Sequence, residues 1–293
     1  MTGRNSPAQP AAANLRRGRP VLILMILLVG LLPPAVAQAQ DAASSQQQVP
    51  TPLSPQDLAK SAHNPFEEFV KIPIEPEAGF GIGPHHDPGA SLNIEPTLPL
   101  QITDDWDVIT QPNLTIAYQP SPHGQFGLQD FQTLSYLTPA HAAKWIWGIG
   151  PIFQFPTASS KELGTGHWCA GPTAAVVYSN GPWFNGIRTY QLMSFAGNRS
   201  RGSVNLTYVE PDFSYNFESG WYIDTDPAIT FDWTANTANA WTLPVGADVG
   251  KAFNIGKQAM TMQIGSYDFV KYPPNTPQWG IRLSITFLFP TGF

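Results

Sequence analysis

The chain has 293 residues, a formal net charge of −6 and only 12% charged residues, while hydrophobic residues make up 42%. An acidic chain argues against nucleic-acid binding and against simple electrostatic docking on anionic lipid. Because Cys169 is its single cysteine, an intrachain disulfide and a metal site built from several cysteines are excluded.

The N-terminal segment predicts export. Four arginines precede an unbroken apolar run over residues 21–32, and Pro33-Pro34 then ends the run. Residues 35–39, Ala-Val-Ala-Gln-Ala, place small residues at the −3 and −1 positions of a cleavage site for signal peptidase. We expect residues 1–39 to be a signal peptide that is cleaved near Ala39, because the run is too short to span a bilayer. A retained membrane anchor is the alternative.

Removal of this segment makes the chain more acidic. Four of the 15 basic residues leave with it and all 21 acidic residues remain, so 11 bases face 21 acids and the net charge becomes −10. Residues 40–63 are rich in Gln, Ser and Pro without a strand pattern, which predicts a flexible periplasmic leader. Within it, Ser54-Pro55 favours one short helical turn. The leader, up to Phe66, is a candidate plug.

From residue 64 onward, apolar and polar residues alternate in runs separated by turn-forming residues. Successive side chains of a strand point to opposite faces, so each run has an apolar and a polar face. The clear runs are 91–102, 111–119, 145–155, 221–233 and 241–248, and weaker ones are 66–82, 127–138, 168–178, 184–195, 204–217, 259–271 and 279–289. In 204–217 the apolar phase shifts near Tyr208-Val209, which predicts a bulge.

The runs predict an all-β fold, a transmembrane antiparallel up-and-down β-barrel of about twelve strands over residues 64–293, in the outer membrane of a Gram-negative bacterium. No stretch of the mature chain approaches ~18 consecutive apolar residues, which excludes helical spans. Barrels of about eight strands are filled by side chains and those of about sixteen hold an open channel, so this one should have a narrow or plugged lumen.

The last run resembles the closing strands of bacterial outer-membrane barrels. Its apolar residues occupy odd positions from Trp279 to Phe289, and the chain ends on Phe293 in the same phase. We therefore expect the barrel assembly machinery to recognise this strand. Pro290 cannot donate a ladder hydrogen bond, so the strand should loosen there.

Eight of the nine tryptophans fall into two groups near the ends of runs. The connections between runs alternate between short and longer ones, as periplasmic turns and external loops do. The first group begins runs after short connections, and the second lies beside long ones: Trp106, Trp145, Trp183 and Trp221, then Trp168, Trp233, Trp241 and Trp279. Two such rings are typical of aromatic belts at the two membrane interfaces. The alternative, a soluble β-sandwich, would bury its tryptophans in mid-strand.

If aromatic residues mark the lipid face, the opposite face lines the lumen. The residues predicted there are Glu95, Asp130, Asp224, Asp226, Asp232, Asp248 and Arg282, with Arg188 as a further candidate. A lumen with excess carboxylates should favour cations or neutral solutes over anions. The alternative is a packed polar core, in which Arg282 pairs with acids and nothing passes.

Catalytic motifs are weak, so we expect no enzyme, no cofactor and no metal site. In His85-His86-Asp87 adjacent side chains point to opposite sides, which favours a solvated loop. His167 lies near Ser159, Ser160 and Glu162 in the chain, but nothing fixes the geometry of a Ser-His-acid set. A lipid-modifying barrel enzyme is therefore the less favoured alternative.

A block pattern extends over most of residues 64–293: Gly81-Ile-Gly-Pro84, Leu92-Asn-Ile-Glu-Pro96, Trp147-Gly-Ile-Gly-Pro151, Leu163-Gly-Thr-Gly-His-Trp168 and Trp241-Thr-Leu-Pro-Val-Gly246. It resembles the outer-membrane family named for the meta-pathway of phenol degradation, whose members are often catalogued as transporters or as neuromedin U. The resemblance implies a porin-like transporter that takes up small compounds, aromatic ones among them. The family has no defined catalytic motif, so no site residue carries over.

The partners expected are outer-membrane lipid, the assembly machinery and a small-molecule solute, with no nucleic acid. A structural or adhesive barrel, whose external loops do the work, is the alternative from another functional class. The short loops, which lack aromatic or charged clusters, weigh against adhesion.

Overall fold

The computed structural model describes residues 53–67, 69–141 and 144–291. The predicted signal peptide with its cleavage site near Ala39, the leader residues 40–52 and the terminal Phe293 lie outside these residues. Their roles therefore stay predictions.

The described residues form one helix and fifteen strands. No helix among them is long and apolar enough to cross a membrane. In chain order the elements are α2 (Pro55–His63), β1 (Phe69–Ile82), β2 (Asp87–Ile94), β3 (Leu98–Gln101), β4 (Trp106–Gln119), β5 (Gln125–Leu128), β6 (Phe131–Pro139), β7 (Trp145–Phe155), β8 (His167–Asn180), β9 (Trp183–Gly197), β10 (Asn205–Asn216), β11 (Trp221–Thr225), β12 (Ile229–Asp232), β13 (Trp241–Ile255), β14 (Gln258–Lys271) and β15 (Trp279–Pro290).

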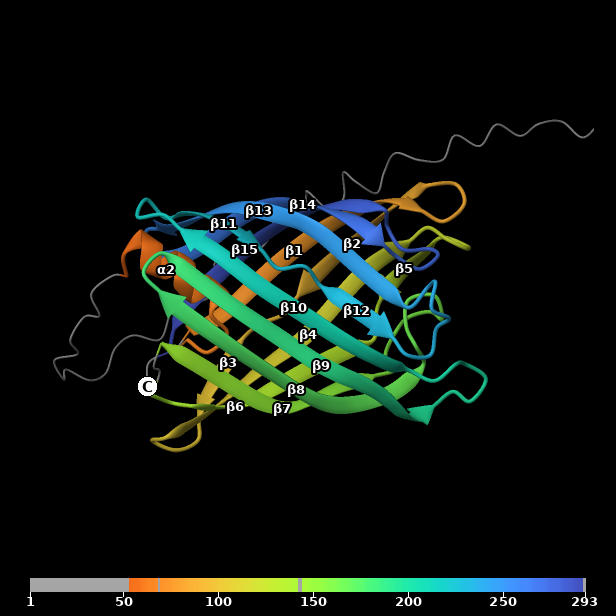
Figure 1. Ribbon diagram of the computed structural model, residues 1–293, viewed down its shortest axis with the longest axis horizontal. Helices are drawn as coiled ribbons and strands as arrows, with labels where there is room; N and C mark the ends of the chain where they lie inside the picture. Colours follow the sequence, from red (N-terminus) through yellow and green to blue (C-terminus); the bar gives the residue numbers. More distant parts are fainter. Residues whose placement is uncertain (1–52, 68, 142–143, 292–293) are drawn as a thin grey trace, which may run out of the picture. The chain divides into compact units, whose positions relative to one another are not determined.

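All fifteen strands belong to one antiparallel sheet that closes on itself, because β15 pairs with β1 and β9 pairs with β10 (Figure 1). Three barrel strands are interrupted. β2 and β3 both pair with one edge of β4, β5 and β6 pair with its other edge, and β11 and β12 both lie between β10 and β13. Each such pair is one barrel strand, so the fifteen segments make a closed barrel of twelve strands. The predicted fold class is confirmed.

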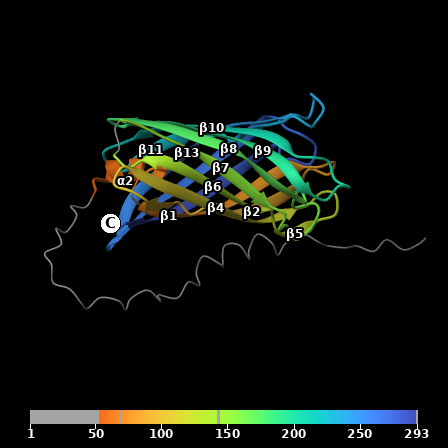
Figure 2. The ribbon, with the colours of Figure 1, turned by 90° about the horizontal axis from the view of Figure 1, so that it is seen from below.

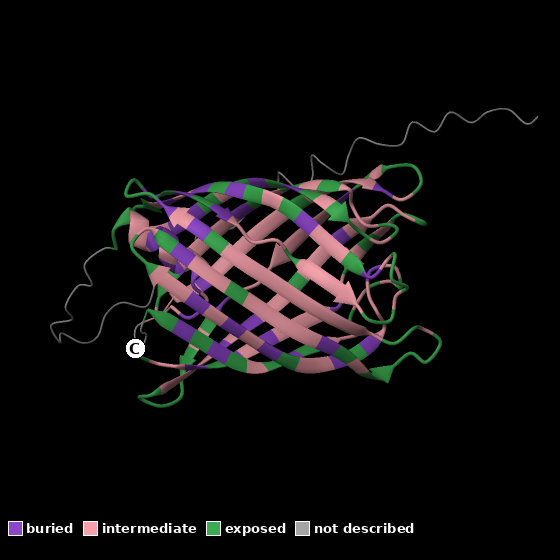
Figure 3. Cartoon of the chain, viewed as in Figure 1, coloured by how far each residue is buried: buried purple, intermediate pink, exposed green. Residues whose placement is uncertain are grey.

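The strand alternation separates an inner from an outer face, as Figure 3 shows along many strands. In β7, Trp145 and Ile149 are 63% and 55% exposed, whereas Ile146 and Ile152 are 8% and 0% exposed. Successive side chains of a strand point alternately into and out of a closed sheet. The large apolar residues predicted for the lipid face therefore lie on the outside of the barrel.

The connections at one end of the barrel are on average shorter than those at the other end. The ranges 102–105, 140–144, 181–182, 217–220 and 256–257 define the short-connection end, and 83–86, 120–124, 156–166, 198–204, 233–240 and 272–278 define the long-connection end. In the two-residue turns, Gly181 and Gly256 have φ of 56° and 60°, a left-handed backbone that glycine adopts without steric cost. The predicted asymmetry between short and long connections is present.

Two details of the strands differ from expectation. The pairing of β10 with β9 keeps one register from Asn205 to Tyr215, so the predicted bulge near Tyr208-Val209 is wrong. The apolar phase shifts there because Tyr208 is an inward aromatic residue whose hydroxyl donates to Glu210. Pro290, where loosening was predicted, still pairs with Phe69 and is the last residue of β15, so the strand ends at the proline and not before it.

The leader contains a helix of nine residues, α2, where a flexible segment with at most one helical turn was expected. Ser54 caps it by accepting a hydrogen bond from the Asp57 amide at 3.1 Å. The helix ends at His63 because Pro65 follows, and a proline disfavours helical backbone in the preceding residue. Figures 1 and 2 both place α2 at the end of the barrel that carries the short connections.

The buried face of α2 packs against inward side chains of the barrel wall. Leu58 and Ala59 form a buried cluster with Tyr222 of β11, Ala252 of β13 and Leu288 of β15. Burial of these apolar side chains, which an isolated nine-residue helix would expose, is what keeps so short a helix folded.

Candidate functional site

The barrel encloses a cavity of about 630 Å³. Its lining includes His63 of α2 at the short-connection end and Pro277, which lies in the connection between β14 and β15 at the long-connection end. Side chains of β1, β2, β4, β9, β10, β14 and β15 line it between these limits. A volume of this size is typical of pockets for small molecules, roughly 300–1,000 Å³.

An ion pair crosses this cavity. Arg188 of β9 places Nη1 2.7 Å from Oε1 of Glu95, which lies where β2 gives way to β3. Four barrel strands, containing β4, β6, β7 and β8, separate the two residues along the wall, so the pair spans the interior. Arg188 Nη2 also donates to Glu210 at 3.0 Å, and Asn113 Nδ2 donates to Glu95 Oε2 at 2.6 Å. We call these four residues the cross-lumen bridge.

Two tyrosines stand beside the bridge. The rings of Tyr190 and Tyr208 stack with centroids 4.5 Å apart and planes 4° apart, and both line the cavity. The guanidinium carbon of Arg188 lies 5.8 Å from the Tyr208 centroid. The bridge thus offers aromatic rings next to a paired cation, a surface on which a planar solute can stack.

A second charged cluster lies on the wall formed by β11, β13, β14 and β15. Arg282 of β15 pairs with Asp248 of β13, Nη2 to Oδ2 2.7 Å, and with Asp226, which follows β11. The Tyr267 hydroxyl lies 2.8 Å from Asp226 Oδ1 and also contacts Asp248. Charge-assisted contacts of this kind are the strong ones in a protein interior, and they fix the position of Arg282.

Asp224 of β11 lies next to this cluster without joining it. It is 2% exposed and faces Asp248 directly in the pairing of β11 with β13. Within the described part of the chain, neither of its carboxylate oxygens has a hydrogen-bond partner. Buried carboxylates normally have such partners, because their desolvation is otherwise uncompensated.

The structure places the seven predicted lumen residues in three different settings. Glu95, Asp226 and Arg282 line the cavity, whereas Asp224 and Asp248 are buried in the wall beside it. Asp130 and Asp232 do not line it, which corrects the prediction for both.

Asp130 and Asp232 instead stabilise the connections next to them. Asp130 accepts hydrogen bonds from the amides of Thr165 at 2.6 Å and Ala158 at 3.1 Å, and so holds the connection 156–166. Asp232 accepts from the Thr234 amide at 2.8 Å, two residues further along the chain. Both residues lie at strand ends. The alternation places them on the inner face, but at a strand end the side chain bonds to the adjacent connection and does not line the lumen.

Sequence reasoning missed several charged residues of the lining. The cavity is lined by six acidic and three basic side chains: Glu75, Glu77, Glu95, Glu210, Asp212 and Asp226, with Lys71, Arg188 and Arg282. In β1 the alternation could have identified them, because the apolar residues Val70, Ile72 and Ile74 alternate with the inward residues. In β10 the inward Tyr208 interrupts the apolar–polar alternation, so the inward acidic residues of that strand could not be recognised.

His63 closes the helix end of the cavity. Its ring meets Tyr222 edge-on with centroids 4.8 Å apart, and its Nδ1 lies 4.0 Å from Asp212 Oδ2. Burial lowers the pKa of His63 to about 4, so the docked imidazole is neutral at neutral pH. Just beyond, the ammonium of Lys71 donates to the Asn64 carbonyl and holds the chain that leaves the helix.

The eight predicted belt tryptophans all lie at or near strand ends. Trp106, Trp145, Trp183 and Trp221 begin strands at the short-connection end, and Trp168, Trp233, Trp241 and Trp279 lie at the long-connection end. All except the half-buried Trp106 are exposed. Their contact with lipid headgroups stays a prediction.

The weak catalytic combinations are not brought together. Among the described residues, His167 Nδ1 lies 3.4 Å from the Ala196 carbonyl and has no hydrogen bond with Ser159, Ser160 or Glu162. His86 Nδ1 lies 3.1 Å from Gln278 Nε2 in a connection. Cys169 is a free, buried thiol in the wall.

The fold is similar to that of solved outer-membrane barrels. An outer-membrane channel from Pseudomonas putida F1 has 17% identity to this chain and a TM-score of 0.57, with 76% of this chain and 96% of that chain covered. The NanC porin has 10% identity and a TM-score of 0.49, with 74% and 98% covered, and outer membrane phospholipase A from Escherichia coli has 11% and 0.42, with 79% and 98% covered.

No protein-family model and no curated protein matches the sequence. The family named for phenol degradation is therefore not confirmed. The likeness to the Pseudomonas putida channel shows that the chain has the fold of an outer-membrane β-barrel.

Proposed function

We propose that this chain is an outer-membrane channel of a Gram-negative bacterium for small cationic or neutral solutes, aromatic compounds among them, with α2 as a plug at the periplasmic end. The observation that carries the proposal is a solute-sized polar cavity inside a closed barrel whose outer face is apolar. A membrane barrel needs that outer face, and a channel needs that interior.

The outer face supports a membrane location. Val245, Ile264 and Leu283 are among the many large apolar side chains that are exposed around the barrel. In water, an apolar surface of this extent would drive aggregation, whereas lipid chains solvate it. The short-connection end, where α2 docks, is assigned to the periplasm because turns there are short in bacterial barrels.

The lining supports the solute class. The lining has six acidic side chains against three basic ones, and this excess of acidic groups favours cations over anions. The stacked pair Tyr190 and Tyr208 provides aromatic surface beside the Arg188–Glu95 ion pair. The aromatic part of the proposal also rests on the family resemblance of the sequence. No residue is assigned a catalytic role.

Conductance in planar bilayers tests the channel and its plug together. We expect the mature protein to conduct weakly, and deletion of residues 40–63 to raise the conductance severalfold. Leu58→Glu should have a similar effect, because a carboxylate cannot replace the buried leucine without loss of docking. Lys60→Gln is the matched control on the same helix, since the Lys60 side chain forms an ion pair with Asp57 of α2 itself.

Heat-modifiable migration on a gel verifies that each variant is a closed barrel. Absence of conductance in all of these closed barrels would contradict the channel and favour a packed polar core, hence a structural or adhesive role. Cell fractionation tests the location: the protein should be recovered with the outer membrane, and recovery in the soluble periplasm would refute the proposal.

A further inference from the structure

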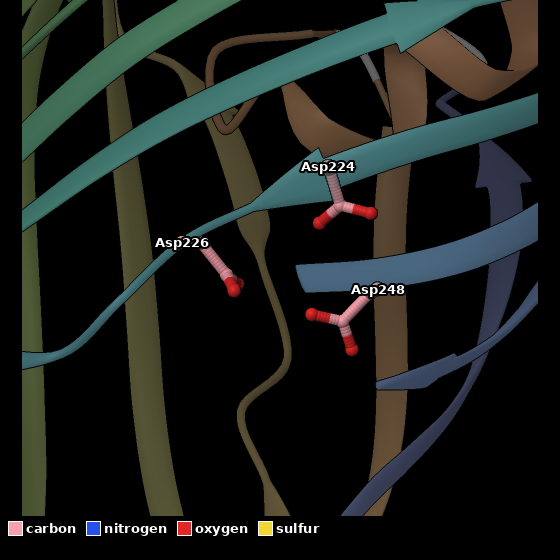
Figure 4. Close-up of side chains that lie close together, drawn as sticks. All are labelled: Asp224, Asp226 and Asp248. Atoms are coloured by element: carbon pink, nitrogen blue, oxygen red, sulfur yellow. The ribbon is translucent and has the colours of Figure 1, made fainter. Parts of the chain in front are cut away.

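Three carboxylates converge in the wall of the barrel. One oxygen from each of Asp224, Asp226 and Asp248 lies within 4.8 Å of the others. Figure 4 shows the three side chains directed toward a common space, from β11, from the segment after it and from β13. Asp224 and Asp248 are direct cross-strand partners. Like charges in that position repel each other, so the arrangement requires a compensating positive charge.

Arg282 supplies part of that charge. It forms ion pairs with Asp226 and Asp248 and none with Asp224. No other Lys, Arg or His within the described ranges forms an ion pair with the three aspartates. Three carboxylates against one guanidinium leave a formal charge of −2, which equals the charge that one divalent cation neutralises.

Asp224 gives an independent indication of a ligand. Its side chain is fully enclosed, and neither oxygen has a hydrogen-bond partner among the described residues. Buried charged groups are otherwise paired or bound to a metal, because an unpaired one is very costly in a medium of low polarity. The unpartnered carboxylate is directed into the same space as Asp226 and Asp248.

We propose that Asp224, Asp226 and Asp248 bind one divalent cation, Ca²⁺. The donor set consists of oxygens alone, which suits a hard cation and not zinc or copper. Ca²⁺ tolerates irregular geometry and completes its shell of six to eight oxygens with water. Asp226 lines the cavity, so the ion and its water reach the site from the lumen. Mg²⁺ fits less well, because it requires a near-octahedral shell.

The site was not foreseen from sequence, where these aspartates were expected only as separate lumen charges. Asp224 and Asp226 lie in one barrel strand, but Asp248 joins them through the pairing of β11 with β13. The site goes beyond the proposed channel function and does not depend on conduction.

Binding is tested on the mature protein in detergent after treatment with EDTA. Titration calorimetry should show one Ca²⁺ per barrel. Tb³⁺, which replaces Ca²⁺, should give luminescence sensitised by the nearby Tyr267, and added Ca²⁺ should displace it. Asp224→Asn should weaken binding about tenfold or more, since affinity follows the number of charged ligands. Asp232→Asn, in the continuation of the same barrel strand, is the control and should bind as the unmodified protein does.

Two outcomes would overturn the site. The first is failure of the unmodified barrel to bind: absence of Ca²⁺ and Tb³⁺ binding at millimolar concentration would mean that Asp224 is instead a neutral acid. Unchanged binding in Asp224→Asn would place the ion elsewhere. If Asp224→Asn does not form a heat-modifiable barrel, Asp226→Asn at the cavity surface is used, and the same loss of binding is expected. Neither readout requires conductance, so failure of the site and failure of the channel are distinguishable.

Discussion

Arg188 and Glu95 join opposite walls of the barrel through a 2.7 Å ion pair. Each end is held by a further partner, Glu210 at the arginine and Asn113 at the carboxylate. Any solute that travels through the cavity passes this cross-lumen bridge. The bridge therefore has two consequences that can be separated by experiment, one for the width of the passage and one for stability.

Arg188→Gln should widen the passage and destabilise the barrel. The conductance of single channels should rise because the guanidinium no longer spans the lumen. The free energy of unfolding should fall by about 3 kcal/mol, because Glu95 and Glu210 are left without their partner. Urea unfolding in lipid vesicles measures the second effect.

The double variant Arg188→Gln with Glu95→Gln is the control for that prediction. It should keep the larger conductance and recover part of the stability, because one unpaired carboxylate has been removed. An unchanged conductance in both variants would show that solutes do not pass the bridge.

The carboxylates without an arginine partner should set the charge selectivity. Glu75 accepts a hydrogen bond from Ser284, and Asp212 Oδ2 lies 4.0 Å from His63 Nδ1. Glu75→Gln combined with Asp212→Asn should therefore lower the cation-to-anion permeability ratio, measured from the reversal potential in a salt gradient. Asp232→Asn, outside the cavity, should leave the ratio unchanged. Anion preference in the unmodified protein would contradict this assignment.

The two faces of β12 should respond differently to a charge. Ile229 pairs with Val209 on the outer face, whereas the next residue, Thr230, pairs with the inward Tyr208. Ile229→Arg should reduce the free energy of unfolding by about 2–4 kcal/mol, because it places a cation in hydrocarbon. Thr230→Arg should cost much less, since its side chain points to the polar interior. Equal losses in urea unfolding would mean that the assigned faces are wrong.

Acid should release α2 through His63. Its pKa is about 4 when docked, against 6.5 for the ordinary side chain, so the undocked helix binds a proton more readily. Docking is therefore strongest above pH 6.5 and weakens as the pH falls toward 4, by about 3 kcal/mol in all. Conductance should rise over this range. His63→Gln, which cannot titrate, should remove this pH dependence, and a profile that it leaves unaltered would assign the transition to another group.

The strand pattern and the orientation of most side chains could be predicted from sequence, because a strand has a period of two and that period is local. The strand at 145–155 could be predicted from its own residues without knowing which strands lie beside it. The outward orientation of the tryptophans followed from the same periodicity. The prediction became wrong where one residue type overrode the rule, as at Tyr208, an aromatic residue that points inward because its hydroxyl has a carboxylate partner.

The contacts across the interior were decided by the tertiary structure alone. Alternation says which face a residue occupies, but the closure and stagger of the barrel determine which faces meet and at what depth. Arg188 and Glu95 are 93 positions apart in the chain. For the same reason, Asp130 and Asp232 have the predicted phase but lie at strand ends, and α2 became a docked helix only because Tyr222, Ala252 and Leu288 cover it.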